Sequence, residues 1–239
     1  MREVDRNLAS GYTDKKHEKG ESVLRNREIS KAVISRLPRY YRYLGDLLNS
    51  GTERISSGEL SRLMKVTASQ IRQDLNNFGG FGQQGYGYNV RYLRDEIGKI
   101  LGLEKNHTMI IIGTGHLGKA IANYENFNSG SIHIVGLFDV REEVIGTRVR
   151  QTEIRSVNEL PAFLAENDVE IAVLTLPKKN AKEVAQVLVN NGIHAIWNFA
   201  HTDLNLELPD DVIVENVHLS DSLMQLTYRL SAKENSGKE

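Results

Sequence analysis

The glycines of the stretch IIIGTGHLG, residues 110–118, are the residues whose types and spacing most clearly point to chemistry. Gly113, Gly115 and Gly118 follow an apolar run that predicts a buried strand, and helical spacing follows them. Such a turn brings backbone N–H groups against a pyrophosphate at the start of a helix. Asp139 ends the next predicted strand, where an acid can accept the hydroxyls of an adenosine ribose. The pattern predicts a dinucleotide site formed by Gly113, Thr114, Gly115, His116, Leu117, Gly118 and Asp139.

The acid at position 139 also bears on which dinucleotide is bound. A carboxylate there repels a 2′-phosphate and favours NADH and NAD⁺, although Arg141 two residues later weakens this preference. Strand and helix patterns alternate from residue 108 to residue 217 and predict one sheet of six strands at most. Because a ligand of such a sheet lies at the carboxyl ends of the strands, Leu176, Pro177 and Asn198-Phe199 are further candidates.

Catalysis by such a domain would need a proton-transfer group and a second domain for the substrate. No remaining segment is large enough for a substrate domain, and His201 is the one histidine well placed to act beside a cofactor. We therefore expect a sensor and not an enzyme. Two alternatives stay open: an NAD-dependent oxidoreductase with an accessory helical domain, and a structural or CoA-binding α/β protein.

The sequence before residue 78 predicts two short capped helices. Ser56 and Glu59 have the spacing of a capping box, and Thr67 and Gln70 repeat that spacing eleven residues later. Helices that follow each other after a tight turn form a helix-turn-helix, and a plain three-helix bundle is the alternative. The second helix would expose amides, a hydroxyl and an arginine, which pair with base edges and phosphates. These residues are Ser69, Gln70, Arg72, Gln73 and Asn76.

The stretch FGGFGQQGYGYNV, residues 78–90, follows the second helix directly. Glycines bounded by aromatic residues suit a short hairpin whose backbone can approach another molecule closely. A hairpin after a helix-turn-helix is the order of a winged helix, so we expect a wing that lies along DNA. Gln83, Gln84 and Tyr86 are then candidates for the minor groove or for phosphates. A glycine-rich surface loop is the alternative.

The charge composition differs between the two parts of the chain, and the amino-acid composition excludes some classes of site. Residues 1–90 carry 15 Lys and Arg against 10 Asp and Glu, whereas residues 91–239 carry 15 against 21. A basic front part suits a polyanion such as nucleic acid, although drift can produce the same difference. The absence of cysteine excludes disulfides, thiolate nucleophiles and cysteine–zinc sites. With neither a signal core nor a run of about 20 apolar residues, we expect a cytoplasmic protein without a membrane partner.

Several motifs, taken in order, resemble the Rex family of redox-sensing transcriptional repressors. They are ISKAVISRLPRYYRYLGDL, KVTASQIRQDLNNFGGFGQQGYGYNV, IIIGTGHLG, VNNGI followed by WNFA, and ENVHLSDSL. The resemblance runs from about Ile29 to Leu230. It implies a homodimer that binds palindromic double-stranded operator DNA through winged helices and exchanges its C-terminal helix between subunits. It also implies that NADH releases the DNA, whereas NAD⁺ competes with NADH and permits repression.

The same resemblance implies roles for individual residues. It assigns the pyrophosphate to Gly113–Gly118, the ribose to Asp139 and a place near the nicotinamide to Tyr124. Since an apolar pocket would disfavour the cationic ring of NAD⁺, Tyr124 and Phe199 are candidates for the surroundings of the nicotinamide. It places Arg42 opposite the start of the partner's exchanged helix. Together with the residue patterns, it gives these candidates for DNA contact: Ser57, Thr67, Ser69, Gln70, Arg72, Gln73, Gln84, Gly85 and Tyr86.

This sequence departs from the family pattern at four positions. His116 stands where the family usually has Asn or Arg, and Gln73 and Gln84 stand where many members have a basic residue. His218 stands where many members have an aspartate that pairs with the residue matching Arg42. A protonated histidine would repel Arg42, so we hypothesise that coupling between NADH and DNA weakens at lower pH.

The expected fold class is α/β with an N-terminal winged helix, a Rossmann domain and a C-terminal exchanged helix. Residues 1–24 lack an apolar period and are expected to be a disordered extension. The expected boundaries are 25–90 for the winged helix, 91–107 for a connecting helix and linker, and 108–217 for the Rossmann domain. Residues 218–239 would form the exchanged helix, capped by Ser220, and a tail.

Overall fold

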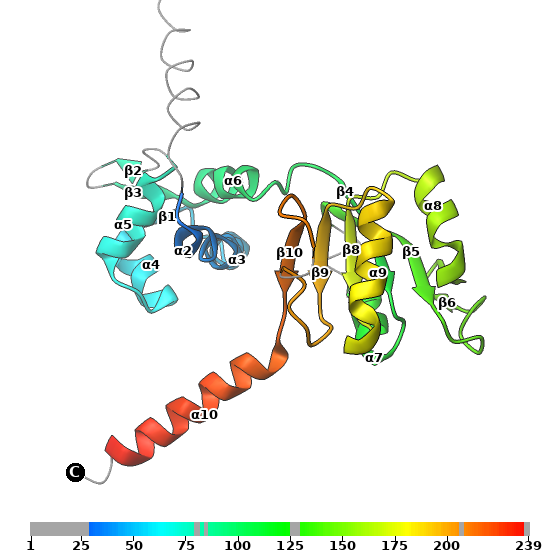
Figure 1. Cartoon of the computed structure of the whole chain (residues 1–239). Helices are drawn as coiled ribbons and strands as arrows, with labels where there is room; N and C mark the ends of the chain where they lie inside the picture. The colour runs from blue at the N-terminus through cyan, green and yellow to red at the C-terminus, as the bar shows by residue number, and fades with distance from the viewer. Residues whose placement is uncertain (1–28, 79–81, 84–85, 125–129, 206–207, 237–239) are drawn as a thin grey trace, which may run out of the picture. The chain divides into compact units, whose positions relative to one another are not determined.

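A computed structural model describes residues 29–78, 82–83, 86–124, 130–205 and 208–236 of the chain (Figure 1). The expected extension, residues 1–24, lies outside the described residues. The chain divides into two compact units, residues 1–104 and residues 105–239, and each is described by itself. Within the described ranges, each helix is either too short or too polar to cross a lipid bilayer.

The first unit combines helices with a small antiparallel sheet, as a winged helix requires. Its strands are β1 (Arg54–Ile55), β2 (Gly82–Gln83) and β3 (Gly87–Asn89), paired in the order β1-β3-β2. The hairpin β2–β3 is the wing expected from the glycine-rich stretch. The sequence reading missed β1, because two residues are too few to show alternation. The helices are α2 (Lys31–Ile34), α3 (Leu37–Asn49), α4 (Ser57–Met64), α5 (Ala68–Asn76) and α6 (Val90–Ile100).

The N-termini of α4 and α5 show which capping predictions hold. Ser56 Oγ accepts from the backbone N of Glu59, and the Glu59 carboxylate accepts from the backbone N of Ser56, so the capping box is confirmed. Thr67 caps α5 by accepting from the backbone N of Gln70 at 3.1 Å. The second half of that predicted box is wrong, because the Gln70 amide donates to Asp74 instead.

Helix α6 belongs to the core of the first unit, although we expected residues 91–107 to connect two domains. Val90, Leu93 and Ile97 are fully buried and pack in the same cluster as Leu37 and Leu44 of α3. The apolar face that predicted an amphipathic helix is therefore the face that closes the winged helix. The boundary between the units falls after Glu104, several residues beyond the end of α6.

The second unit is a Rossmann-like sheet with helices on both faces (Figure 1). Its strand order is β10-β9-β8-β4-β5-β7-β6. Six strands are parallel, and the seventh, β6, pairs antiparallel with β7 as a short hairpin, so the expected maximum of six strands is wrong. The strands are β4 (His107–Ile112), β5 (Ile132–Asp139), β6 (Arg148–Val149), β7 (Thr152–Ser156), β8 (Ile171–Leu174), β9 (Ala195–Asn198) and β10 (Ile213–Asn216). The helices are α7 (His116–Asn123), η2 (Val157–Glu159), α8 (Leu160–Glu166), α9 (Lys178–Asn190) and α10 (Leu219–Ser236).

The central strands of this sheet are buried on both faces, which explains their near-continuous apolar sequence. Ile110 and Ile112 pack with α8 and α9 on one face, whereas Met109 and Ile111 pack with Ile121 of α7 on the other. Because successive side chains of a strand alternate between faces, β4 supplies both cores. Its carboxyl end is therefore held rigidly at the point where the glycine loop begins.

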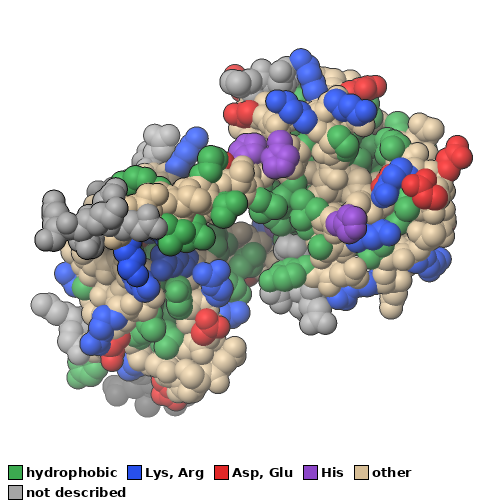
Figure 2. All heavy atoms as spheres, turned by 90° about the horizontal axis from the view of Figure 1, so that it is seen from below, with side chains coloured by type: hydrophobic (Ala, Val, Ile, Leu, Met, Phe, Trp, Pro, Cys, Tyr) green, Lys and Arg blue, Asp and Glu red, His purple; other side chains and the backbone are tan. Residues whose placement is uncertain are grey.

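Helix α10 differs from the other helices of the second unit, because every residue described from 219 to 233 is exposed. The helix begins at Leu219, so Ser220 lies inside its first turn and the predicted Ser220 cap is wrong. The backbone N of Asp221 donates to the carbonyl of His218, one residue before the helix. Figure 2 shows hydrophobic side chains exposed on the molecular surface, and those of α10 are Leu219, Leu223, Met224, Leu226, Tyr228 and Leu230.

Candidate dinucleotide site and nucleic-acid interface

The three glycines of the loop between β4 and α7 occupy three different environments. Gly113 has φ +96°, and a Cβ there would press on the backbone carbonyl of Thr175. A Cβ on Gly118 would collide with the carbonyl oxygen of Gly113, so the loop and the first turn of α7 touch directly. A Cβ on Gly115 would meet open space. These environments correspond to a tight turn, close helix packing and a surface left open for a ligand.

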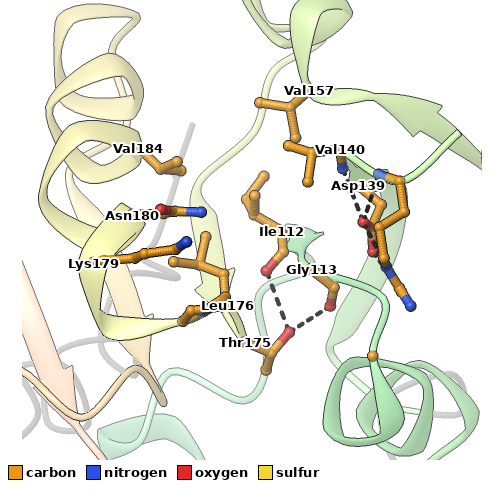
Figure 3. A pocket seen from close by; sticks show the side chains of 13 residues that line it. Ile112, Gly113, Asp139, Val140, Val157, Thr175, Leu176, Lys179, Asn180 and Val184 are labelled. Carbon is orange, nitrogen blue, oxygen red and sulfur yellow. Dashed lines mark hydrogen bonds and ion pairs between the residues drawn. The ribbon is translucent and has the colours of Figure 1, made fainter.

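The side chain of Thr175, the residue after β8, holds this loop through contacts with two backbone carbonyls. Its hydroxyl donates to the carbonyl of Gly113 at 2.6 Å and lies 3.2 Å from the carbonyl of Ile112. The backbone N of Gly113 also donates inside the protein, to the carbonyl of Phe138, so the start of the loop is held by both its carbonyl and its N–H group. Figure 3 shows both Thr175 contacts at the floor of a pocket.

Asp139 ties the end of β5 to the glycine loop. Its Oδ2 accepts from the backbone N and Oγ1 of Thr114 and from Nη2 of Arg141, and its Oδ1 accepts from the backbone N of Val140 and Arg141 and from Nε of Arg141. The carboxylate is only 5% exposed. Burial alone would raise the pKa of Asp139, but the hydrogen bonds from Arg141 and Thr114 hold it well below its ordinary value. We expected free oxygens that accept ribose hydroxyls, whereas here both are engaged.

A cavity of about 520 Å³ opens at the carboxyl ends of β4, β5 and β8 (Figure 3). Of the candidate residues, Gly113, Gly115, Asp139, Leu176 and Pro177 line it. The sequence reading missed Val140, Val157, Thr175, Lys179, Asn180 and Val184, and weighed Arg141 only as an obstacle. Each of these follows a strand end or lies in the first two turns of the next helix, so topology is the signal that could have found them.

The remaining candidates of the second unit do not line this cavity. His116, Leu117 and Gly118 form the first turn of α7, and buried Thr114 is held by Asp139. Tyr124 ends α7 and is 53% exposed. Phe199 packs edge-on against Trp197, with ring centroids 4.7 Å apart. The buried amide of Asn198 is taken by the backbone N of Ala200, the carbonyl of Thr202 and Asn216.

In the first unit, a buried ionic network positions α5. Fully buried Asp74 of α5 accepts two hydrogen bonds from the Arg36 guanidinium at 2.7 Å, one from Tyr40 Oη at 3.0 Å and one from Gln70 Nε2 at 2.7 Å. Burial alone would raise the pKa of Asp74, but the hydrogen bonds from Arg36, Gln70 and Tyr40 keep it below its ordinary value. The network fixes how α5 is rotated about its axis.

That rotation decides which residues of α5 are exposed. Ser69, Arg72, Gln73 and Asn76 are exposed. The Arg72 guanidinium donates to Ser57 Oγ at 3.1 Å, which joins two candidates from different helices. Two other candidates are engaged internally: Thr67 by its capping bond, and Gln70 by Asp74.

In the wing, the Tyr86 side chain is 70% exposed, and its carbonyl lies 3.4 Å from Arg54 Nη1. Gln84 and Gly85 lie outside the described residues. An exposed aromatic ring at the tip of a hairpin, with a guanidinium against its backbone, suits contact with a polyanion.

The two coupling candidates lie in different units and are described separately. The Arg42 guanidinium carbon lies 5.8 Å from the centre of the Tyr43 ring. His218, immediately before α10, stacks on His201 with ring centroids 6.3 Å apart. No group of three or more acidic or histidine side chains that could hold a metal ion occurs among the described residues.

Comparisons with known proteins agree with this division. Residues 28–76 match the family "Putative DNA-binding protein N-terminus", and residues 104–202 match the family "CoA binding domain". The redox-sensing transcriptional repressor Rex of Thermoanaerobacter pseudethanolicus is 54% identical over 207 residues, which cover 87% of this chain and 92% of the relative. The corresponding repressor of Clostridium novyi is 53% identical over 207 residues, 87% of this chain and 98% of the relative.

This chain belongs to the Rex family of redox-sensing transcriptional repressors. The predicted family and fold class are thereby confirmed, and as a Rex-family protein the chain is a transcriptional repressor and not an enzyme. The alternative of an oxidoreductase that uses His201 is therefore set aside.

Solved structures of another Rex-family repressor, RSP, resemble this chain over most of its length. RSP in complex with beta-NAD+ and operator DNA matches with 54% identity and a TM-score of 0.81, over 89% of this chain and 97% of RSP. RSP in complex with beta-NADH matches with 51% identity and a TM-score of 0.82, over 89% and 99%. The same fold has thus been seen with DNA and with both redox states of the dinucleotide.

Proposed function

We propose that this Rex-family repressor binds operator DNA when NADH is scarce and releases it when NADH fills the second unit. The observation that carries this proposal is the pairing of two features in one chain. One is the winged helix with exposed Arg72 and Tyr86, and the other is the glycine loop with its cavity. The RSP complexes with operator DNA and with beta-NADH support both halves.

On the DNA side, α5 is the recognition helix and the β2–β3 hairpin is the wing. Arg72 and Gln73 reach base edges or phosphates, since a guanidinium and an amide are the groups that read bases in the major groove. Ser57 and Ser69 flank them, and Tyr86 approaches the minor groove or the backbone. With glutamine in place of a basic residue at positions 73 and 84, fewer phosphates are neutralised and the salt dependence of binding is shallower.

On the dinucleotide side, the pyrophosphate lies on the N-terminus of α7 against Gly115. The adenosine half extends over Asp139 towards Val140 and Val157, and the nicotinamide half extends over Pro177 towards β9. NAD⁺ differs from NADH by one positive charge and a planar ring. Tyr124 and Phe199, on the nicotinamide side, form apolar surroundings that disfavour the cationic ring.

Helix α10 supports the proposal of a homodimer. Leu219, Leu223, Leu226 and Leu230 are each more than half exposed and recur at steps of four, three and four residues, which makes one apolar stripe. A helix of this kind gains most of its stability by packing that stripe. We propose that a second copy of this chain covers it, as the family pattern implies, and that the dimer works in the cytoplasm, where operator DNA is available.

Coupling between the two sites follows from linkage. NADH and operator must prefer different placements of the two wings, so that binding of one weakens the other. A free energy of coupling of about 1–3 kcal/mol changes operator affinity roughly 5- to 150-fold. A dimer reads half-sites about one DNA turn apart, so a modest change of wing spacing is enough to break the match.

A mobility-shift experiment tests this function. A palindrome is selected with the purified protein from a random duplex library, and the complex is titrated with NADH at fixed NAD⁺. We expect the shifted band to disappear as NADH rises and to persist with NAD⁺ alone. Failure to select any duplex sequence, or release by both dinucleotides at equal concentration, would contradict the proposal.

A further inference from the structure

Asn180, in the first turn of α9, points into the cavity of the second unit and has no assigned role. Figure 3 shows its amide directed from α9 towards Ile112 and Val140 on the opposite wall. The side chain is half-buried, and across the described ranges its amide has no hydrogen-bond partner; the backbone N of Asn180 donates to the carbonyl of Pro177. The amide is not fully buried, so it is open to solvent in the cavity and available to pair with a ligand that displaces this solvent.

The walls around Asn180 are apolar and come from four separate elements. Val140 follows β5, Val157 follows β7, Leu176 follows β8, and Val184 lies one turn beyond Asn180 on α9. The charged side chains that line this cavity are Asp139 and Arg141, which pair with each other, and Lys179. A slot with apolar sides and one free amide suits a flat heteroaromatic ring that carries both a donor and an acceptor on one edge.

The position of the slot identifies the half of the dinucleotide that it takes. Asn180 and Leu176 follow β8, and the slot extends from them across β4 to Val140, which directly follows Asp139 at the proposed ribose position, and to Val157 beyond β7. The adenine of a dinucleotide bound across the sheet lies on the side of β5 and β7, and the nicotinamide lies on the other. The occupant of the slot is therefore adenine.

We propose that Asn180 is the residue that recognises the adenine base, with Oδ1 accepting from the N6 amino group and Nδ2 donating to N7. Asparagine pairs with adenine in this bidentate way in other recognition settings. The inference deepens the proposed function and rests on it. It makes α9 a base-specific element, in addition to the glycine loop, which contacts the pyrophosphate without regard to the base.

The test compares NADH with reduced nicotinamide hypoxanthine dinucleotide, in which a carbonyl replaces the 6-amino group. Both are fluorescent, so their dissociation constants are measured in the same way on the full chain. We expect the wild type to prefer NADH roughly 5- to 150-fold, the range for one bidentate pair. Asn180→Ala should reduce that ratio to near one, mainly by weakening NADH. Asn180→Asp keeps the acceptor for the amino group and should retain a preference for NADH while binding both more weakly.

Asn190→Ala is the matched control, because Asn190 lies exposed at the other end of α9. It should leave the ratio unchanged. If Asn180→Ala weakens both dinucleotides equally, Asn180 contacts the ribose or pyrophosphate, and base recognition is overturned. If the wild type binds both dinucleotides equally well, the inference fails while the proposed function stands. If the wild type binds neither, both fail.

Discussion

Oδ2 of Asp139 accepts two hydrogen bonds from Thr114, one from the backbone N and one from Oγ1, each at 2.7 Å. These bonds join the end of β5 to the turn that holds the glycines. The residue that we expect to face the ligand therefore also holds the loop that we propose as the pyrophosphate site. We expect substitution of Asp139 to affect both the contact with the ligand and the position of the loop.

Asp139→Asn should weaken NADH binding about 10-fold or more. The amide NH₂ cannot accept from Thr114 or Arg141, so at least one buried donor loses its partner, at about 1–3 kcal/mol. Thr114→Val keeps the hydrogen bond from its backbone N to Asp139 and removes only the one from the hydroxyl, so it should weaken NADH binding less. Fluorescence titration of NADH measures both, with exposed Asp210→Asn as the control. Wild-type affinity in Asp139→Asn would refute a positioning role.

Gly115→Ala and Gly118→Ala form a matched pair with different expected results. A methyl group on Gly118 meets the carbonyl of Gly113, so Gly118→Ala should lower the thermal stability of the second unit and abolish NADH binding. A methyl group on Gly115 meets no protein atom but faces the pyrophosphate, so this variant should fold normally and bind NADH at least 10-fold more weakly. The fluorescence of Trp197, the single tryptophan, follows unfolding of the second unit. Equal effects of the two substitutions on stability would contradict this assignment.

Asp74→Asn should destabilise the first unit and weaken operator binding while leaving NADH affinity unchanged. Breaking a buried ion pair costs about 3–5 kcal/mol of folding stability. We expect a loss near the lower end of this range because the Arg36 side chain is 28% exposed. Urea unfolding followed by circular dichroism gives the loss of stability, and exposed Asp46→Asn is the control. Unchanged operator affinity would mean that the network does not position α5.

The same carboxylate predicts an acid dependence with a defined sign. Because the pKa of Asp74 is lower in the folded chain, its ionisation contributes stability that is complete above the unfolded value of about 3.9. This contribution is lost as pH falls from that value through the folded pKa. Asp74→Asn lacks it, so the difference in stability between wild type and variant should shrink progressively as pH falls below about 4. A constant difference down to pH 2 would contradict the linkage.

Arg72→Ala should reduce operator affinity by about 1–3 kcal/mol and relax the preference at one base pair, if Arg72 reads a base. If it neutralises a phosphate, affinity falls equally for all sequences and the salt slope drops by about one. Anisotropy titrations at several salt concentrations separate the two outcomes. Arg155→Ala removes the same charge from the second unit and should change neither. Full operator binding in Arg72→Ala would remove α5 from the recognition surface.

Much of this fold could be predicted from the sequence, because its signals are local. The Ser56–Glu59 box, the glycine loop and the apolar run of β4 each depend on residues close together in the chain. What failed was set by pairings that no sequence pattern marks. The Gln70 amide pairs with Asp74 because that buried carboxylate, fixed by Arg36 at the N-cap of α3, needs a further donor. The strands β1 and β6 exist only because β3 and β7 pair with them.

Of the residues that line the cavity, the sequence pointed to Gly113 and Gly115 and missed most of the walls, for the same reason. A glycine pattern is local and predicts a pyrophosphate contact by itself. Val157 and Asn180 carry no motif and reach the cavity only through the strand order. The engagement of Asp139 by Arg141 was also not foreseen, since the sequence shows that an acid and a base are neighbours but not that their side chains bond.

Coupling between NADH binding and operator binding is measured most directly by a closed thermodynamic cycle on the purified full-length chain. Operator affinity is measured without dinucleotide and at saturating NADH, and NADH affinity is measured without DNA and at saturating operator. We expect each ligand to weaken the binding of the other by the same factor, between roughly 5- and 150-fold. An operator affinity that is the same in the presence and absence of saturating NADH would contradict this expectation.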